Sequence, residues 1–316
     1  DATTDIVGHL TNGLETPVNQ IVTPAGTQVD LPGIRPNALA LSPDGKLLVT
    51  SGLTHELIAV NPATGKISQR VTFPSDTITS AAPLAEGILN PDKKAELSFT
   101  GLAFSPDGSR IFLSNVNGDI KVFSVAGDGK ISPQFSIPLP PVHAHDRTTE
   151  IPAGIAVSRD GKKLYVAFNL SNRLAELDAR DGKVLRTWDV GVAPFDVVLA
   201  GGKAYVSNWG GRRPDKNSLT GPAGLGTRVR VDARSIADEG SVSVVDLTGP
   251  DSAKPKQIVI GPHACALAAS PNGRYVVAAS AGSDMLSVID TRRDEVVESL
   301  SARQTPGDPF GAQPDA

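Results

Sequence analysis

Cysteine is almost absent from this sequence of 316 residues, which contains only Cys265. A single cysteine excludes an intrachain disulfide, and it excludes metal and haem motifs that need two or more cysteines. Cys265 lies in the apolar segment 264–267, where a small buried residue is the expected interpretation rather than a reactive thiol. Cysteine poverty fits both a cytosolic protein and an oxidising compartment, so it does not distinguish the two.

An excess of charge and long apolar runs are also missing. The formal net charge is −4, which does not favour nucleic acid or an acidic membrane as a partner. No apolar run approaches the roughly 20 residues that a membrane span needs, so we expect no span. The chain opens with the polar segment 1–5 rather than a basic and then apolar leader. We therefore expect that any signal peptide has been removed or never existed.

One pattern is repeated five times. An apolar strand leads into Ser-Pro-Asp-Gly or a variant of it, and a second apolar strand follows. Proline presets φ in such a turn and glycine accepts a positive φ. The five turns occupy residues 42–45, 105–108, 158–161, 200–203 and 270–273.

Each repeat predicts four short strands. In the first repeat they lie at 37–41, 46–51, 57–60 and 66–71, and the fourth is the most polar. Four antiparallel strands with an apolar inner and a polar outer strand are typical of a β-propeller blade. We therefore predict an all-β fold, a β-propeller of four-stranded antiparallel blades. A β-sandwich is the main alternative, but it gives no reason for the turn to recur. A helical fold is not supported, because the sequence lacks apolar residues in the i, i+3, i+4, i+7 pattern of a helix.

The repeat is interrupted at the end of the chain. Residues 313–316 align with 35–38, which open the first repeat, and 27–31 have the pattern of an outer strand. We therefore predict an N-terminal extension at 1–26 and a propeller at 27–316, with five complete blades and the start of a sixth. These blades are expected to belong to a seven-bladed ring, with about two blades absent from this chain or supplied by another polypeptide.

Three insertions are expected on one face of the propeller. A plain blade needs about 40–45 residues, and most of the repeats are longer. The additional residues lie at 74–99, 138–153 and 208–240. The first two join successive blades and the third joins a second to a third strand, so all three emerge on the face opposite the short turns. Long loops on one face indicate the functional side of a scaffold.

Several segments resemble a known repeat family. Residues 164–169 and 204–208 are close to a "LYVAN" core, and residues 285–291 are close to a "TVSVIDT" strand. The chain resembles the YVTN-type β-propeller repeats of bacterial extracytoplasmic proteins. The resemblance implies a periplasmic or secreted location and supports the propeller fold. It says little about which reaction, if any, the protein catalyses.

A narrower resemblance involves three other segments. Residues 23–29, 208–213 and 306–311 are similar to a subgroup in which a seven-bladed secreted propeller precedes an alkaline-phosphatase-like phosphoesterase domain. The resemblance implies that such a domain, with its divalent metal, follows residue 316. No metal-ligating motif of that domain occurs in this chain, so no catalytic residue is carried over and no cofactor is evident.

The insertions contain two candidate sites. His143, His145 and Asp146 lie in one interblade loop and offer imidazole and carboxylate ligands for a transition metal. The alternative is an exposed loop, because no further protein ligand is identified. Trp209, Arg212 and Arg213 open the longest insertion. The two arginines favour bidentate binding of a phosphate or carboxylate, and the alternatives are docking of a domain or surface ion pairs.

Four polar residues lie at or just before the start of first strands, where side chains line the mouth of the central channel. They are Arg35, Asn37, Asp196 and His263. A small polar ligand is the functional interpretation, and bound water is the alternative. The glycine-rich segment 221–226 lacks the lysine and the strand–helix context of a phosphate loop. No nucleophile-elbow sequence is present.

Three functions follow from these observations. The first is a non-catalytic binding or scaffold module that positions a phosphoesterase domain, another protein domain or a substrate through the long-loop face, with a small anionic ligand as a further partner. The second is a lactonase-like hydrolase with its site at the channel mouth, although His263, Asp196 and Asn37 are few ligands for a divalent cation. The third is a structural protein of the cell surface.

Overall fold

The computed structural model describes residues 8–10, 13–15, 21–22, 26, 28–75, 91–224, 227–250, 252–303, 305, 307 and 311–315. This part of the chain contains no α-helix. Its main elements are five four-stranded antiparallel sheets, each formed by consecutive segments of the chain with the first strand innermost. The predicted all-β fold of four-stranded blades is therefore confirmed.

The blades follow the repeats in order. Blade one contains β4 (Pro36–Leu41), β5 (Leu48–Gly52), β6 (Glu56–Asn61) and β7 (Lys66–Thr72). Blade two contains β8 (Leu97–Phe104), β9 (Arg110–Asn115), β10 (Asp119–Val125) and β11 (Ile131–Pro138). Blade three contains β14 (Pro152–Val157), β15 (Lys163–Phe168), β16 (Arg173–Asp178) and β17 (Val184–Asp189). Blade four contains β18 (Pro194–Ala200), β19 (Lys203–Asn208), β22 (Gly240–Asp246) and β23 (Lys256–Ile260). Blade five contains β24 (Ala264–Ala269), β25 (Tyr275–Ser280), β26 (Met285–Asp290) and β27 (Glu295–Ser301).

Smaller sheets lie outside the blades. The 138–153 insertion forms a hairpin of β12 (Pro141–Ala144) and β13 (Arg147–Thr149). The 208–240 insertion contains a second hairpin of β20 (Thr220–Pro222) and β21 (Arg228–Arg230). The N-terminal extension contributes β1 (Gly8–Leu10), β2 (Gly13–Glu15) and β3 (Ile21–Val22) in one sheet. Residues 76–90 of the 74–99 insertion lie outside the described residues, and β8 already begins at residue 97.

The repeated tetrapeptide forms the same hydrogen-bonded turn in successive blades. Ser42 Oγ donates to Asp44 Oδ1 at 2.7 Å and accepts the Leu47 N–H at 2.9 Å. The following glycine, Gly45, has a φ of 71°. Corresponding bonds join Ser105 to Asp107 at 2.6 Å and Ser270 to Asn272 at 2.8 Å. This side-chain capping replaces the backbone partners that a tight turn leaves unsatisfied, which explains the recurrence of serine and aspartate.

The hydrophobic core lies between neighbouring blades rather than at one centre. Phe73 of blade one and Phe123 of blade two are both fully buried, and their rings meet edge to face at 6.1 Å. Polar side chains also cross these interfaces: Tyr205 Oη of blade four donates to Asp294 Oδ1 of blade five at 2.6 Å. Burial of apolar side chains on both faces of a blade supplies most of the stability of such an array.

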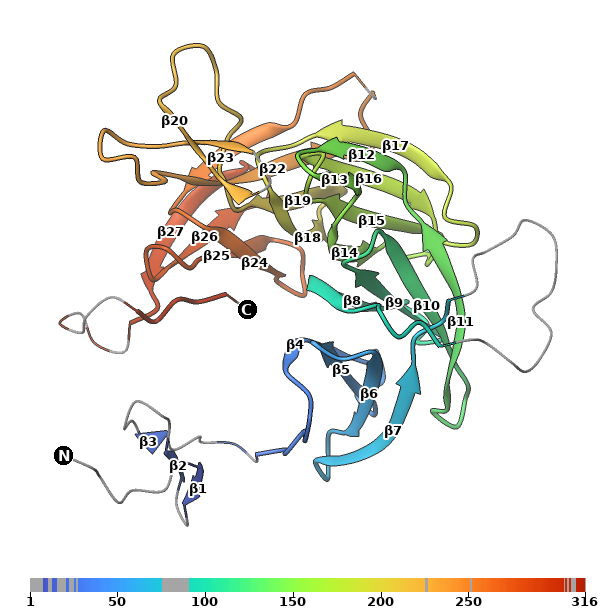
Figure 1. Ribbon diagram of the computed structural model, residues 1–316. Coiled ribbons are helices and arrows are strands. Elements are labelled where there is room, and N and C mark those ends of the chain that lie inside the picture. Colours follow the sequence, from blue (N-terminus) through green and yellow to red (C-terminus); the bar gives the residue numbers. More distant parts are fainter. Residues whose placement is uncertain are drawn as a thin grey trace.

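The blades form an arc with β4 and β24 at its two ends (Figure 1). Neighbouring inner strands pack in the order β4, β8, β14, β18 and β24. Leu39 and Leu41, on the face of β4 that is turned away from blade two, are 66% and 54% exposed. Large aliphatic side chains of an inner strand are normally covered by the next blade. The exposed face of blade one is therefore an uncovered blade interface.

The end of the chain follows the path of an interblade connection. Asp284 of blade five accepts the N–H groups of Gly311 and Gln313, each at 2.8 Å. Asn172 has the corresponding place in blade three and accepts the Ala193 N–H at 2.8 Å, just before β18 begins. Gln313 and Ala193 also share a positive φ, at 42° and 51°. Residues 311–315 therefore lie where a connection into a further inner strand would run.

Two strands predicted at the ends of the repeat array are not observed. The outer strand predicted at 27–31 is wrong, because the described residues 28–31 form no strand. Residues 314 and 315 form no strand either, and residue 316 lies outside the described residues. An outer strand needs the third strand of a blade as its partner. Each of the five sheets already has its own fourth strand, so no partner is available within the described chain.

Candidate functional site

Four rings form a continuous row on the long-loop face. Phe99 and Phe195 meet edge to face at 5.2 Å, Phe195 and Trp209 stack at 5.7 Å, and Trp209 and His263 stack at 4.7 Å with an interplanar angle of 17°. We call these four residues the aromatic row. They lie near the start of β8, near the start of β18, directly after β19 and directly before β24. The row therefore joins blades two, four and five at the channel mouth.

Backbone strain accompanies the aromatic row at both ends. Phe99 has a φ of 50° and His263 a φ of 59°. A non-glycine residue in this region costs on the order of 1–3 kcal/mol and persists only where the surroundings hold it. The His263 carbonyl accepts the Ala281 N–H at 3.1 Å, which fixes one end. Phe99 is nevertheless 37% exposed. The fold therefore tolerates a strained backbone at a residue whose aromatic ring is partly in solvent.

Beside the aromatic row, the inner strands of all five blades line an open cavity of about 510 Å³. Among the described residues that line it, Asp196 alone has an ionisable side chain. The residues that line it are Leu31, Pro36, Asn37, Ala38, Leu39, Thr100, Leu102, Ile155, Asp196, Val197, Val198, Ala266 and Leu267. The cavity therefore combines one carboxyl group with a largely aliphatic wall.

Asp196 accepts three hydrogen bonds from the inner strands of three blades. Its Oδ2 accepts the Leu267 N–H at 2.9 Å, and its Oδ1 accepts the Val197 N–H at 2.8 Å and the Thr100 hydroxyl at 3.3 Å. Gly154 of β14 lies against it, and a Cβ atom at Gly154 would approach Asp196 Oδ1 to 2.4 Å. The glycine is therefore what lets the side chain of Asp196 reach from blade four towards blade two.

Burial raises the pKa of Asp196 to about 6, and the three hydrogen bonds offset only part of that effect. No lysine or arginine of the described chain forms an ion pair with Asp196. The carboxyl group is therefore ionised at pH 7.5 without a protein counter-ion. Burial also lowers the pKa of His263, which keeps its ring neutral in the stack with Trp209 at that pH.

The four residues predicted at the channel mouth lie in three different places. Asn37 and Asp196 line the cavity, whereas His263 belongs to the aromatic row above it. Arg35 lies at the surface outside the lining, and its carbonyl accepts the Leu53 N–H at 3.2 Å. The structure thus brings two of the four predicted side chains into one cavity.

The two predicted anion-binding arginines already have partners. Arg212 Nε and Nη2 lie 3.0 and 2.6 Å from the two oxygens of Glu239, so the pair closes the base of the 208–240 insertion. Arg213 Nε donates to the Val190 carbonyl at 2.7 Å and its Nη2 to Asp189 at 3.2 Å. These contacts correspond to surface ion pairs, which were the alternative to anion binding for Arg212 and Arg213. Trp209, predicted with them, belongs instead to the aromatic row.

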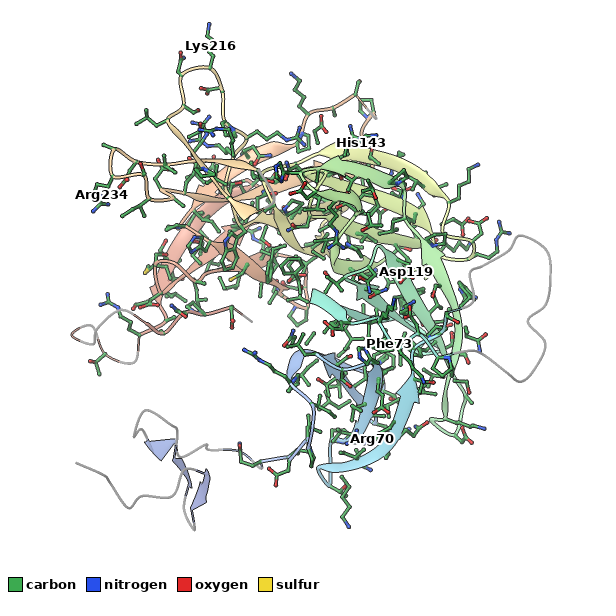
Figure 2. All side chains as sticks on the ribbon, in the orientation of Figure 1. Arg70, Phe73, Asp119, His143, Lys216 and Arg234 are labelled. Carbon is green, nitrogen blue, oxygen red and sulfur yellow. The ribbon has the colours of Figure 1, made fainter. Side chains whose placement is uncertain are left out.

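The predicted metal ligands are not brought together as a three-ligand cluster. His145 Nδ1 lies 2.9 Å from Asp146 Oδ2, and both side chains are more than two thirds exposed, at 71% and 83%. Across the part of the chain that the structure describes, no group of three or more His, Cys, Asp or Glu side chains has the arrangement of a metal site. Figure 2 shows His143, which lies in β12 of the same hairpin, and it shows Lys216 and Arg234 on loops that project away from the blades.

Phe99, Thr100 and Phe195 were not predicted from the sequence. Each lies at the position just before or within the start of an inner strand, as Asp196 does. Their position in the repeat is the sequence feature from which they could have been predicted. Phe99 and Phe195 occupy it in copies two and four of the repeat, next to the polar residues Thr100 and Asp196.

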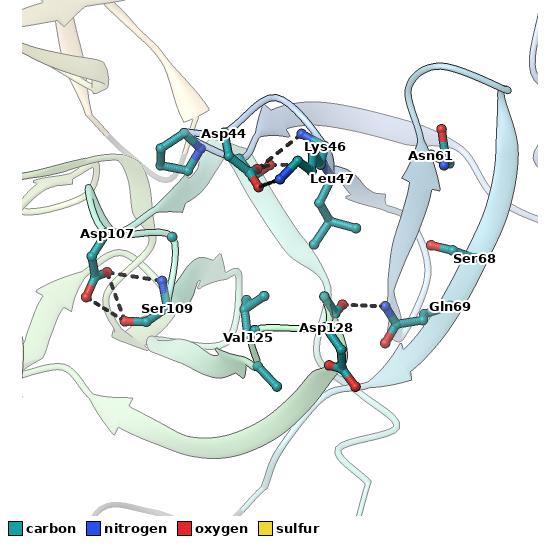
Figure 3. Close-up of a pocket in the computed structure, with 16 residues that line it drawn as sticks. Asp44, Lys46, Leu47, Asn61, Ser68, Gln69, Asp107, Ser109, Val125 and Asp128 are labelled. Atoms are coloured by element: carbon teal, nitrogen blue, oxygen red, sulfur yellow. Dashed lines mark hydrogen bonds and ion pairs between the residues drawn. The ribbon is translucent and has the colours of Figure 1, made fainter.

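The short-turn face has clefts of a different kind. A cleft of about 610 Å³ lies between blades one and two, with Asp44 and Asp107 on adjacent turns (Figure 3). Hydrogen bonds from Ser42 and from Ser105 lower the pKa of these two carboxyl groups. Gln69 Nε2 closes the cleft by donating to the Gly129 carbonyl at 2.8 Å. A similar cleft lies between blades two and three, so this is a scaffold feature that repeats with the turns.

Comparisons with known proteins identify the fold. No protein-family model matches the chain, and no curated protein matches it. Solved structures do match it over most of its length. The chain is a β-propeller. It is similar to the β-propeller domain of Cps50 (Swd1) from Myceliophteria thermophila, at 13% identity with a TM-score of 0.57, over 87% of this chain and 75% of that one.

Two further solved structures support the same fold. U3-55K matches at 11% identity with a TM-score of 0.58, over 88% of this chain and 69% of that one. The dihydro-heme d1 dehydrogenase NirN, solved in complex with DHE, matches at 14% identity with a TM-score of 0.51, over 85% of this chain and 48% of that one. At these identities the likeness concerns the propeller fold alone. Among the described residues, no helix has the length and hydropathy needed to cross a membrane.

Proposed function

We propose that this chain is a non-catalytic β-propeller interaction module that binds its partner on the long-loop face, around the channel mouth. The observation that carries the proposal is the aromatic row, in which Phe99 has a positive φ and is partly exposed. Exposed aromatic residues surrounded by polar groups are typical of the central residues of protein interfaces. Propeller domains as a class act as binding scaffolds.

The 208–240 insertion supports the same face. Leu219 and Ile236 are 62% and 54% exposed on it, and the Arg212–Glu239 pair fixes its base beside Trp209. Large apolar side chains that are exposed among polar residues often mark an interaction surface. The partner we propose is an alkaline-phosphatase-like phosphoesterase domain or its substrate, in a periplasmic or secreted protein. The resemblance of residues 23–29, 208–213 and 306–311 to propellers of that subgroup supports this choice.

Binding measurements test this proposal. The chain is titrated with the phosphoesterase domain of its own gene product in an isothermal calorimeter. Phe99→Ala and Leu219→Ala are expected to weaken binding at least tenfold, about 1.4 kcal/mol each. Lys46→Ala, on the exposed short-turn face, is the matched control and should leave binding unchanged. Equal effects of all three variants, or a gene without such a domain, would reject the proposed partner.

Completion of the ring is the second part of the proposal. We propose that two further blades lie between β24 and β4, which gives a seven-bladed ring. The support is the exposed Leu39 and Leu41 on one end of the arc and the interblade path of residues 311–315 at the other. These blades belong to the same gene product or to another polypeptide. A closed five-bladed ring in solution scattering of the isolated chain would reject this part.

A hydrolase at the channel mouth is the second candidate function. The raised pKa of Asp196 favours it, because perturbed carboxyl groups in cavities are common in active sites. In the described part of the lining, the other polar side chains are those of Asn37 and Thr100. Lactone hydrolysis that requires a divalent cation and is lost in Asp196→Asn would support this function over the interaction module.

A further inference from the structure

The mouth of the channel is built in two layers. β8 and β18 both run inward from the long-loop face, and each contributes an aromatic residue followed directly by a polar one. The rings of Phe99 and Phe195 meet in the outer layer at 5.2 Å. Thr100 Oγ1 and Asp196 Oδ1 meet in the inner layer at 3.3 Å. Successive residues of a strand rise by about 3.3 Å, so the carboxyl group lies roughly one residue below the rings.

The inner layer has a negative charge that no described residue of the cavity lining balances. Asp196 has the one ionisable side chain found among the described lining residues, and its three hydrogen bonds occupy three of the roughly four acceptor positions of a carboxylate. An ionised carboxyl group that keeps only part of its contact with water is costly unless a cation or additional donors compensate it. The remaining acceptor position and the uncompensated charge therefore favour a cationic ligand.

The rest of the lining selects the kind of cation. A divalent metal ion such as Mg²⁺ or Ca²⁺ takes six or more oxygen ligands, whereas among the described lining residues three, Asp196, Asn37 and Thr100, have side-chain oxygens. Most of the other residues that line the cavity are aliphatic, and Phe99 and Phe195, whose rings meet, directly precede the lining residues Thr100 and Asp196. Alkylated ammonium groups prefer such surroundings, because their charge interacts with carboxylates and ring faces while their methyl groups pack on apolar walls. The volume of about 510 Å³ lies within the range of small-molecule sites.

We infer that the central cavity is a binding site for a small organic cation with an alkylated ammonium group. The ammonium charge lies against Asp196, its methyl groups pack against aliphatic residues such as Ile155 and Val198, and the aromatic row borders the entrance. The inference deepens the proposed function in that it names the ligand class for the same face, and it does not require the phosphoesterase partner.

Calorimetric titration of the whole chain with choline at pH 7.5 tests the inference. The neutral analogue 3,3-dimethyl-1-butanol has the same shape without the charge, and we expect it to bind at least tenfold more weakly. Asp196→Asn is expected to lower the choline affinity at least tenfold. Asp128→Asn removes an equal charge from an exposed turn on the opposite face and should leave it unchanged. At pH 5 choline binding should weaken, because Asp196 is then protonated, while binding of the neutral analogue stays constant.

A second variant keeps the test decisive if Asp196→Asn does not fold. Ala266→Leu adds three carbon atoms to the lining from β24 and retains the charge, so it should reduce choline binding by occupying the cavity. Equal affinities for choline and its neutral analogue, or no binding of choline at 50 mM, would overturn the inference. Competition by Mg²⁺ or Ca²⁺ at lower concentration than choline would identify a metal site and overturn it as well. Phosphoesterase binding that persists without choline binding would leave the proposed function intact.

Discussion

Replacement of Asp196 by asparagine is expected to change how the stability of the protein depends on pH. The folded pKa of about 6 lies above the usual 3.8 of an aspartate. Between these values the folded protein holds a proton that the unfolded chain has released, so the contribution of Asp196 to stability is complete below pH 3.8 and is lost as the pH rises through 6. A difference of about two pKa units corresponds to up to about 3 kcal/mol.

The side chain retains some solvent contact through the cavity, so we expect 2–3 kcal/mol, roughly, rather than the full figure. Asparagine has the same shape and cannot ionise, so it removes this pH dependence. Relative to the native protein, Asp196→Asn should therefore gain about 2–3 kcal/mol of unfolding free energy between pH 4 and pH 7.5. Any constant cost of the altered hydrogen bonds, such as the one to the Leu267 N–H, cancels in this comparison.

Urea denaturation followed by circular dichroism at pH 4, 5, 6 and 7.5 measures the difference, with the slope of each transition checked for constancy. Asp128→Asn is the control and should run parallel to the native protein, because Asp128 is exposed on the opposite face. A difference between Asp196→Asn and the native protein that is constant with pH would refute the reasoning. It would mean that water reaches the carboxyl group as freely in the folded state as in the unfolded one.

Three other changes have defined outcomes. Lys121→Met should cost about 3–5 kcal/mol in urea denaturation, because Lys121 is 1% exposed and its ammonium lies within 3.0 Å of two carboxylates that would remain unpaired. Leu57→Ala, at a fully buried position, should cost about 2–5 kcal/mol, whereas Leu41→Ala, 54% exposed, should cost less than about 0.5 kcal/mol in this chain. His263→Ala should increase acrylamide quenching of Trp209 fluorescence at a cost below about 1.5 kcal/mol, because one ring of the stack is removed.

Each of these predictions has a control variant or a result that would contradict it. Lys130→Met removes an exposed lysine of the same blade and should be nearly neutral. A large cost of Leu41→Ala in the isolated chain would show that a partner already covers that face of β4. Unchanged quenching in His263→Ala would contradict the stacked arrangement, since Trp188, the other tryptophan, is buried and should contribute little.

The repetitive part of the molecule could be predicted from the sequence because its causes are local. A Ser-Pro-Asp-Gly turn such as 42–45 contains its own hydrogen-bond donors and acceptors, and the apolar strands on either side of it are short and well separated. The four-stranded blades and the division into two unequal faces follow directly from it. The outer strand predicted at 27–31 failed for the opposite reason: its partner would have to come from another blade, and strand propensity cannot supply one.

The candidate site was predictable only in part, because contacts between blades decide it. Asp196 and Asn37 could be placed near the channel from their positions in the repeat alone. Arg212 and Arg213 are residues of the kind that binds anions. Their guanidinium groups are instead occupied by carboxylate and carbonyl partners more distant in the sequence, such as Glu239. Phe99 and Phe195 are 96 residues apart, so nothing in either local sequence indicates that their rings meet.

The aromatic row depends on a backbone position that is shared between blades. Ala193 and His263 both precede an inner strand, and both have a positive φ, at 51° and 59°. The same backbone thus accepts alanine in blade four and histidine in blade five. Because the conformation is set by the interblade connection and not by the side chain, the residue at this position is free to vary without loss of the fold. A propeller with an unchanged short-turn face can therefore acquire a new ligand preference through residues such as His263, and these positions are where specificity is to be sought first.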